Sequence, residues 1–143
     1  MSLQVCVDAS VVIPLVVYEA LSEQVRALWV DWRTRNLSIV APFLLGFEVT
    51  ATLRKKVHRG LLTPEEGELA FRIAHSQGIQ FLHPFDLHWR AWELAVRFNR
   101  PTAYDSYYLA LAATLGCEFW TADERLYNTV SAQLPWVRRL AAD

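Results

Sequence analysis

Short apolar runs alternate along the chain with longer segments in which apolar residues recur every three or four positions. Short continuous runs are typical of buried strands, and the longer spacing is typical of helices that bury one face. The pattern predicts strands over residues 3–7, 37–40, 79–82, 118–120 and 136–140. It predicts helices over residues 11–35, 42–59, 63–78, 86–98 and 102–115, and a short helix after Thr121.

Residues that favour helix ends support this division of the chain. Ser10 is a possible N-cap, Pro42 suits the first position of a helix, and Thr63 precedes a proline and two acids. Thr121 and Glu124 have the spacing of a capping box. Short strands that alternate with helices predict an α/β fold whose mostly parallel sheet is covered on both faces.

Length and composition fit a single domain that covers residues 1–143. Hydrophobic residues make up 53% of the chain and charged residues 20%, which excludes a disordered chain and indicates a large core. The net charge of −1 argues against a protein whose whole surface attracts nucleic acid, but it does not exclude a local basic patch.

Cysteine content and the length of the apolar runs indicate the compartment. Cys6 and Cys117 match no zinc-binding spacing and are too few for a disulfide scaffold, which favours a reducing cytoplasm. Residues 11–17 and 39–47 are shorter than the ~20 residues of a membrane span, and residues 1–10 lack the basic segment of a signal peptide. We therefore expect a cytoplasmic protein that does not contact a membrane.

The apolar content also predicts an interface. Six tryptophans in a small domain leave more apolar surface than the core hides. Trp29 and Trp32 lie three positions apart on one predicted helix, and Trp89 and Trp92 repeat that spacing on another. We expect at least one tryptophan of each pair in the core and the others in contact with a partner.

Four acids occupy similar places in the predicted fold. Asp8 and Asp123 follow the first and fourth strands, Asp105 lies in the first turn of a helix, and Glu48 lies about two turns into another. Taken singly, each has an ordinary explanation, because acids stabilise helix N-termini. Taken together, they lie where the carboxyl ends of parallel strands meet, which is the edge at which open sheets bind ligands.

Glu48 has mostly apolar neighbours in sequence: Leu44, Leu45, Phe47, Val49, Ala51 and Leu53. A carboxylate in such surroundings is costly unless it is paired or bound to a metal. Four carboxylates in one crevice also repel one another, and a hard cation removes that conflict. Because the set holds neither histidine nor cysteine, its oxygen ligands suit Mg²⁺, with Mn²⁺ as a substitute.

The acids lie in four short motifs: Val7-Asp8-Ala9-Ser10, Leu44-Leu45-Gly46-Phe47-Glu48-Val49, residues 102–112 and Thr121-Ala122-Asp123. In this order, and over nearly the whole chain, they resemble the PIN-domain ribonucleases, and especially the VapC toxins of bacterial toxin–antitoxin pairs. The resemblance implies a three-layer α/β/α sandwich with a short-stranded, mostly parallel central sheet. It also implies a metal-dependent endoribonuclease.

The resemblance further implies which residues act. The acidic quartet that binds the metal and catalyses hydrolysis would be Asp8, Glu48, Asp105 and Asp123. Ser10 and Thr121 match small hydroxyl positions that support the site. Members of the family differ in the fourth acid, so Glu124 is an alternative to Asp123. The implied partners are an RNA substrate, a second copy of the chain and a small antitoxin that covers the active site.

Basic residues cluster at the end of the helix that carries Glu48: Arg54, Lys55, Lys56, His58 and Arg59. They are either a solvated last turn that complements the helix dipole or a surface that contacts RNA phosphates. Further candidates for RNA contact are Arg90, Arg97, Arg100 and Arg125. The histidines His75, His83 and His88 show no metal-ligand spacing and receive no role.

Three other functions remain open from the sequence. The first is an RNA-processing nuclease of the same family that is not a toxin. The second is a catalytically silent interaction module on the same fold, which a missing acid would favour, but none of the four acids is missing. The third is a phosphatase with Asp8 as nucleophile, which typically has a second acid two residues later, where this chain has Ser10.

Overall fold

The computed structural model describes residues 3–141 and contains, within them, a five-stranded sheet in the order β3-β2-β1-β4-β5. All four strand pairings are parallel. The strands are β1 Gln4–Val7, β2 Ser38–Ala41, β3 Gln80–Phe81, β4 Glu118–Thr121 and β5 Val137–Arg139. The predicted parallel sheet of short strands is therefore confirmed.

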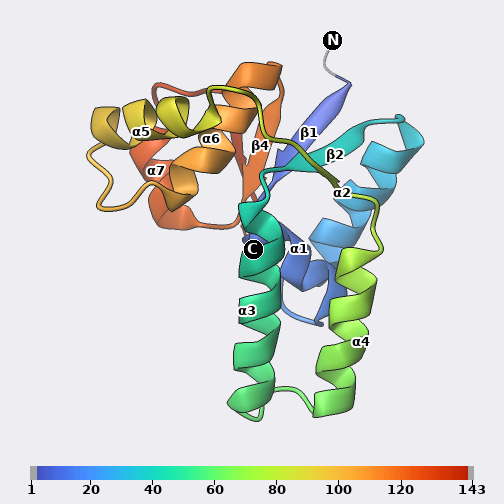
Figure 1. The fold of residues 1–143 in the computed structure, drawn as a ribbon. Coiled ribbons are helices and arrows are strands. Elements are labelled where there is room, and N and C mark those ends of the chain that lie inside the picture. Colours follow the sequence, from blue (N-terminus) through green and yellow to red (C-terminus); the bar gives the residue numbers. More distant parts are fainter. Residues whose placement is uncertain (1–2, 142–143) are drawn as a thin grey trace.

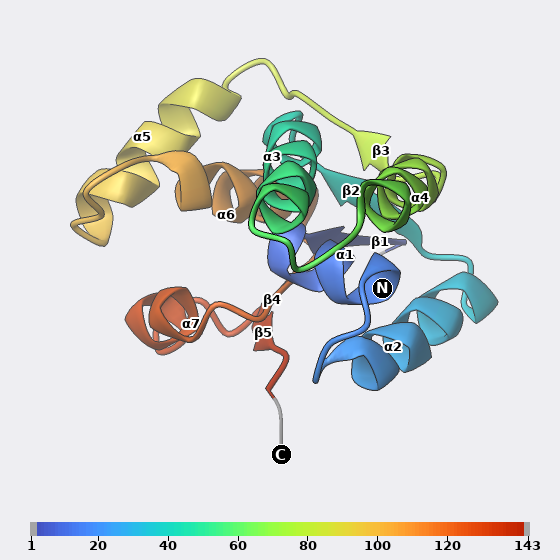
Figure 2. The same cartoon turned by 90° about the horizontal axis from the view of Figure 1, so that it is seen from below.

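Helices cover both faces of this sheet. They are α1 Ala9–Val16, α2 Ser22–Thr34, α3 Leu44–His58, α4 Pro64–His75, α5 Leu87–Arg97, α6 Tyr104–Leu115 and α7 Glu124–Val130. Helices α5 and α6 lie on one side of the sheet and α2 on the other (Figure 2). This is the three-layer α/β/α architecture that the motifs implied. None of the helices among the described residues is both long and apolar enough to cross a membrane.

The core lies on both faces of the central strands, and one part of it is between these strands and helix α6. Val5, Cys6 and Val7 of β1 are buried, as is Phe119 of β4, because a parallel strand in mid-sheet is covered on both faces. The ring of Tyr108 on α6 stacks on Phe119, with ring centroids 5.7 Å apart. Helix α6 is thereby fixed over the junction of β1 and β4.

The predicted helix over residues 11–35 is wrong, because two helices occupy this stretch. Helix α1 ends before Val17, whose backbone is extended (φ −123°, ψ 127°). The hydroxyl of Ser22 then accepts a hydrogen bond from the Glu19 N–H at 2.8 Å and donates to the Val17 carbonyl at 3.1 Å. This closed turn separates α1 from α2.

Two predicted helix caps are also wrong, whereas the predicted cap at Thr63 is confirmed, and Glu66 completes a capping box there that was not predicted. Asp8 rather than Ser10 is the N-cap of α1, and Asp123 rather than Thr121 is the N-cap of α7. Ser10 lies inside α1 and Thr121 inside β4. Their hydroxyls are used in contacts between elements, which local spacing does not reveal.

The two tryptophan pairs have opposite environments. Trp29 and Trp32 are 6% and 1% exposed, so core packing is confirmed for this pair. Trp89 and Trp92 are 62% and 60% exposed, so the prediction that one of them lies in the core is wrong. The buried side of α5 consists of small and aliphatic residues at a spacing of four: Leu87, Ala91 and Ala95.

Helices α3 and α4 form a hairpin that extends away from the sheet (Figure 1). We expect two glycine substitutions in it to have opposite effects. At Gly46 nothing lies near an added Cβ, so Gly46→Ala raises the free energy of unfolding by about 0.5–1 kcal/mol. At Gly67 the added Cβ overlaps a methyl group of β-branched Val57, so Gly67→Ala lowers it by about 1 kcal/mol or more.

Urea unfolding of both variants beside the wild type measures the difference. Equal stabilisation by the two alanines would show that the hairpin is not packed as closely as described.

Candidate active site

The carboxylate of Asp8 is buried at the carboxyl edge of the sheet. Asp8 directly follows β1, the middle strand of the sheet, and is only 9% exposed to solvent. Its Oδ1 accepts hydrogen bonds from the N–H of Ser10 at 3.0 Å and from the Ser10 hydroxyl at 2.5 Å. Its Oδ2 accepts from the Thr121 hydroxyl at 2.5 Å.

The same two hydroxyls connect Asp8 to the end of β4. Ser10 Oγ accepts the N–H of Ala122 at 2.7 Å, and Thr121 Oγ1 accepts the N–H of Asp123 at 3.0 Å. Each hydroxyl therefore receives a backbone proton and donates its own proton to Asp8. The ends of two adjacent strands are held in a fixed relation through one carboxylate.

Glu48 lies in the second turn of α3, nearer the start of the helix than the sequence predicted. The hydroxyl of Tyr108, from α6, donates a hydrogen bond to Glu48 Oε1. Burial raises the pKa of Glu48, the hydrogen bond from Tyr108 opposes that rise, and repulsion from Asp105 adds to it. Burial and the neighbouring Glu48 also raise the pKa of Tyr108, so its hydroxyl stays a proton donor.

Sequence analysis missed Tyr108 as a functional residue. It lies three residues after Asp105 in helix α6, and this spacing puts both on one side of the helix. The ring of Tyr108 is in the core while its hydroxyl donates to Glu48, so the aromatic side chain alone gives no signal of a role in the site.

Asp105 lies in the first turn of α6, as predicted, and is paired with a cation of the same chain. Nη2 of Arg100 lies 2.9 Å from Asp105 Oδ2, and the two side chains are 20% and 37% exposed. The backbone before Arg100 turns sharply, because Asn99 has a left-handed conformation (φ 49°) and the Arg100 N–H bonds to the Ala95 carbonyl at 2.8 Å. This turn directs Arg100 toward the start of α6.

Asp123 is placed differently from the other three acids. Its Oδ1 accepts the N–H of Leu126 at 3.1 Å and so caps α7. Its connection to Asp8 runs through its backbone N–H and the hydroxyl of Thr121. Glu124, the alternative fourth acid, lies 3.5 Å from Arg139.

Electrostatic repulsion connects the three remaining carboxylates. Burial raises the pKa of Asp8 from 3.8 to about 7, the hydrogen bonds from Ser10 and Thr121 oppose this, and the charge of Glu48 adds to the rise. Glu48 is in turn repelled by Asp105. Asp8, Glu48 and Asp105 therefore form a chain of interacting negative groups at one place.

The donor types of this group fit a hard divalent ion, which prefers carboxylate oxygens. The arrangement is not a closed cage, since within residues 3–141 no three histidine, cysteine or acidic side chains are grouped so as to hold a metal ion. Arg100 already provides a positive charge at Asp105. Asp8, Glu48 and Asp105 thus fit the ion in their chemistry, but they are not grouped closely enough to hold it together, and Asp105 has a competing partner.

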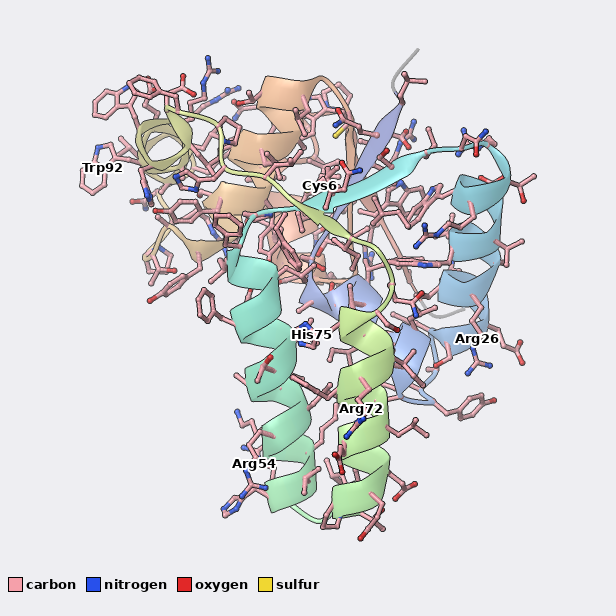
Figure 3. The ribbon with its side chains drawn as sticks, turned by 45° about the vertical axis from the view of Figure 1, so that its right-hand side comes forward. Cys6, Arg26, Arg54, Arg72, His75 and Trp92 are labelled. Carbon is pink, nitrogen blue, oxygen red and sulfur yellow. The ribbon has the colours of Figure 1, made fainter. Side chains whose placement is uncertain are left out.

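The predicted RNA-binding residues lie on the outer part of α3. Arg54, Lys55 and Arg59 are exposed, and Figure 3 shows Arg54 near the end of the hairpin, far from the sheet. Lys56 differs from them, because its Nζ lies 3.5 Å from Glu19 Oε2. The structure thus separates Lys56 from the other basic residues of the cluster.

Comparison with known proteins identifies the family. The family model described as PIN domain matches residues 5–131 of the chain. This chain belongs to the PIN-domain family. The VapC ribonuclease Mb0985 of Mycobacterium bovis and the ribonuclease VapC9 of Mycobacterium tuberculosis are each 31% identical to it over 118 residues, which is 80% of this chain and 91% of each relative. The resemblance of this PIN domain to VapC proteins is therefore confirmed.

The raised pKa of Asp8 predicts a pH dependence of stability in the metal-free PIN domain. Because folded Asp8 binds its proton more tightly than unfolded Asp8, its contribution is complete below pH 3.8 and is lost as the pH rises to about 7. In EDTA we expect Asp8 to lower the free energy of unfolding by about 2–3 kcal/mol between pH 5 and 8.

Asp8→Asn keeps an acceptor for the cap of α1 and removes the charge. Urea unfolding at both pH values, with wild type and variant compared, isolates this contribution. A variant with the same pH dependence as the wild type would contradict the assignment.

Proposed function

We propose that this PIN domain is a metal-dependent endoribonuclease and the toxin of a toxin–antitoxin pair. The observation that carries the proposal is a series of three carboxylates at the carboxyl edge of a parallel sheet, in which Glu48 repels Asp8 and Asp105 repels Glu48. Membership of the PIN-domain family and the similarity to VapC ribonucleases support the reaction class.

The proposed ion is Mg²⁺, with Mn²⁺ as a substitute, and its proposed ligands are Asp8, Glu48 and Asp105. When bound, such an ion lowers the pKa of a water molecule and neutralises charge on the phosphate that is attacked. Asp123 is the fourth proposed acid, and its Oδ1 also caps α7.

Several neutral side chains would position these acids. Ser10 and Thr121 hold both oxygens of Asp8, and Tyr108 holds one oxygen of Glu48. Because each donates a proton, all three hydrogen bonds favour the ionised carboxylates that a metal ion requires. We assign these residues positioning roles and no part in proton transfer.

The proposed partners are RNA, an antitoxin and a second copy of the chain. Arg54, Lys55 and Arg59 are exposed cations available to RNA phosphates. Exposed apolar side chains on α3, α5 and the segment around β3 form the proposed contact between chains: Phe43, Phe47, Phe81, Phe85, Trp89 and Trp92. Two buried free thiols, Cys6 and Cys117, support a reducing, cytoplasmic setting.

A catalytically silent interaction module is the second candidate. The pairing of Asp105 with Arg100 favours it, because the carboxylate is already neutralised without a metal ion. The two candidates differ in whether a divalent ion binds and whether RNA is cut.

We expect Asp105→Asn to reduce metal-dependent RNA cleavage by at least about a hundredfold while the fold is retained, because the substitution keeps the shape of the side chain and removes a ligand charge. Cleavage of single-stranded RNA in EDTA, and then in Mg²⁺ or Mn²⁺, measures the effect. In the wild type, a metal concentration of 100 times the dissociation constant adds about 2.7 kcal/mol of stability, which appears as a rise in melting temperature.

Asp31→Asn is the matched control, since Asp31 is an exposed acid on α2 that pairs only with Arg35 among the described contacts. It is expected to cleave RNA and to gain stability from Mn²⁺ as the wild type does. Full activity of Asp105→Asn would refute its role as a ligand. A wild type that neither binds Mn²⁺ nor cuts RNA would favour the silent module.

We also expect a homodimer in solution, with Trp92 in the contact between chains. Trp92 lies on the outer side of α5 (Figure 3), and a charge at the centre of an apolar interface is costly. Light scattering of the wild type is expected to give the mass of two chains, and Trp92→Glu the mass of one. Tyr18→Glu, at a 77% exposed aromatic residue outside this face, is expected to stay dimeric.

A further inference from the structure

A cavity of about 510 Å³ is lined by residues of α1, of the turn before α2 and of α3. Its apolar walls include Ile13, Pro14 and Leu21, and Ser10, whose hydroxyl bonds to Asp8, also lines it. Its volume is within the range of sites that bind small organic ligands.

An ion pair lies in the lining of this largely apolar cavity. Nζ of Lys56 on α3 is 3.5 Å from Oε2 of Glu19, and the side chains are 22% and 35% exposed. The backbone of Glu19 is fixed, because its N–H donates to the hydroxyl of Ser22, which is completely buried. The cavity therefore offers a carboxylate acceptor and an ammonium donor side by side.

Helix α3 connects the cavity to the proposed metal-binding acids. Glu48, Thr52 and Lys56 follow one another at intervals of four on α3, so they lie along one side of that helix. Thr52 and Lys56 line the cavity, and Lys56 is about 12 Å along the helix axis from Glu48. A strand of RNA with a phosphate at the carboxylates thus has a neighbouring nucleotide within reach of the cavity.

The order of donors and acceptors selects among the bases. The Watson–Crick edge of guanine presents two adjacent N–H donors, which suit one carboxylate, and beside them an oxygen that suits an ammonium group. Adenine and cytosine each offer a single donor group on that edge, and uracil has its one donor between two acceptors. Guanine is therefore the base that can donate two N–H groups to the carboxylate of Glu19 while its oxygen accepts from Lys56.

We propose that this cavity, with Glu19 and Lys56 side by side in its apolar wall and Ser10 beside Asp8, binds a guanine base next to the cleaved bond. The apolar walls would cover the faces of the base, Glu19 would accept its two N–H groups, and Lys56 would donate to its oxygen. The proposal rests on the proposed nuclease function and adds a base preference to it.

The site is tested first without metal or cleavage. Binding of the four nucleoside 5′-monophosphates to the wild-type protein in EDTA is measured by calorimetry or by NMR titration. The guanine nucleotide is expected to bind at least about tenfold more tightly than the other three. Glu19→Gln is expected to lose this preference, and Glu23→Gln, at an exposed acid outside the cavity, is expected to keep it.

Lys56→Met is the second variant in case Glu19→Gln fails to fold, which a thermal melt reveals. It is also expected to lose the preference for the guanine nucleotide. Equal binding of the four nucleotides, or binding of none, would overturn the proposal. The same conclusion would follow if both folded variants kept the wild-type preference.

Cleavage of a randomised RNA, followed by sequencing of the new 5′ ends, separates this proposal from the nuclease function. Metal-dependent cleavage with a guanine at one fixed position beside the cut supports both. Metal-dependent cleavage without that preference overturns the guanine site and leaves the nuclease function intact. Selective binding of the guanine nucleotide without any cleavage overturns the nuclease function instead.

Discussion

The burial of one carboxylate, that of Asp8, determines the arrangement of the whole carboxyl edge of the sheet. Asp8 ends the middle strand, where covering layers on both faces exclude water. Such a group is tolerated only with hydrogen-bond donors, and Ser10 and Thr121 supply them from α1 and β4. Those donors also bind the backbone after β4, so the requirement of a single side chain fixes the relative positions of three elements.

The other two acids add repulsion that a fold selected for stability alone would avoid. Each has one partner that reduces the cost: the hydroxyl of Tyr108 for Glu48 and the guanidinium of Arg100 for Asp105. Neither partner removes the mutual repulsion, which still raises the pKa of Asp8 and of Glu48. Concentrated, incompletely neutralised charge of this kind is typical of sites where stability is given up for function.

Features that depend on local sequence pattern could be predicted from the sequence, whereas contacts between residues far apart in the chain could not. The strands, the helix cap at Thr63 and the placement of Asp8 after β1 follow from short-range preferences. The caps assigned to Ser10 and Thr121 failed because a contact between residues more than a hundred positions apart outweighs local capping. The hydrogen bond between Tyr108 and Glu48 could not be predicted from the sequence, because no spacing pattern shows how α6 lies relative to α3.

The two outer strands have a consequence for how the molecule associates. Strand β3 is only two residues long, and β5 carries Arg138 and Arg139, each paired with an acid of its own chain. Short edges and edge charges both oppose the addition of a strand from a neighbouring molecule. The addition of further strands by backbone hydrogen bonding, which can continue without limit into fibres, is therefore opposed at both edge strands of the sheet. A contact through side chains, as in the proposed homodimer, would close once two copies have met.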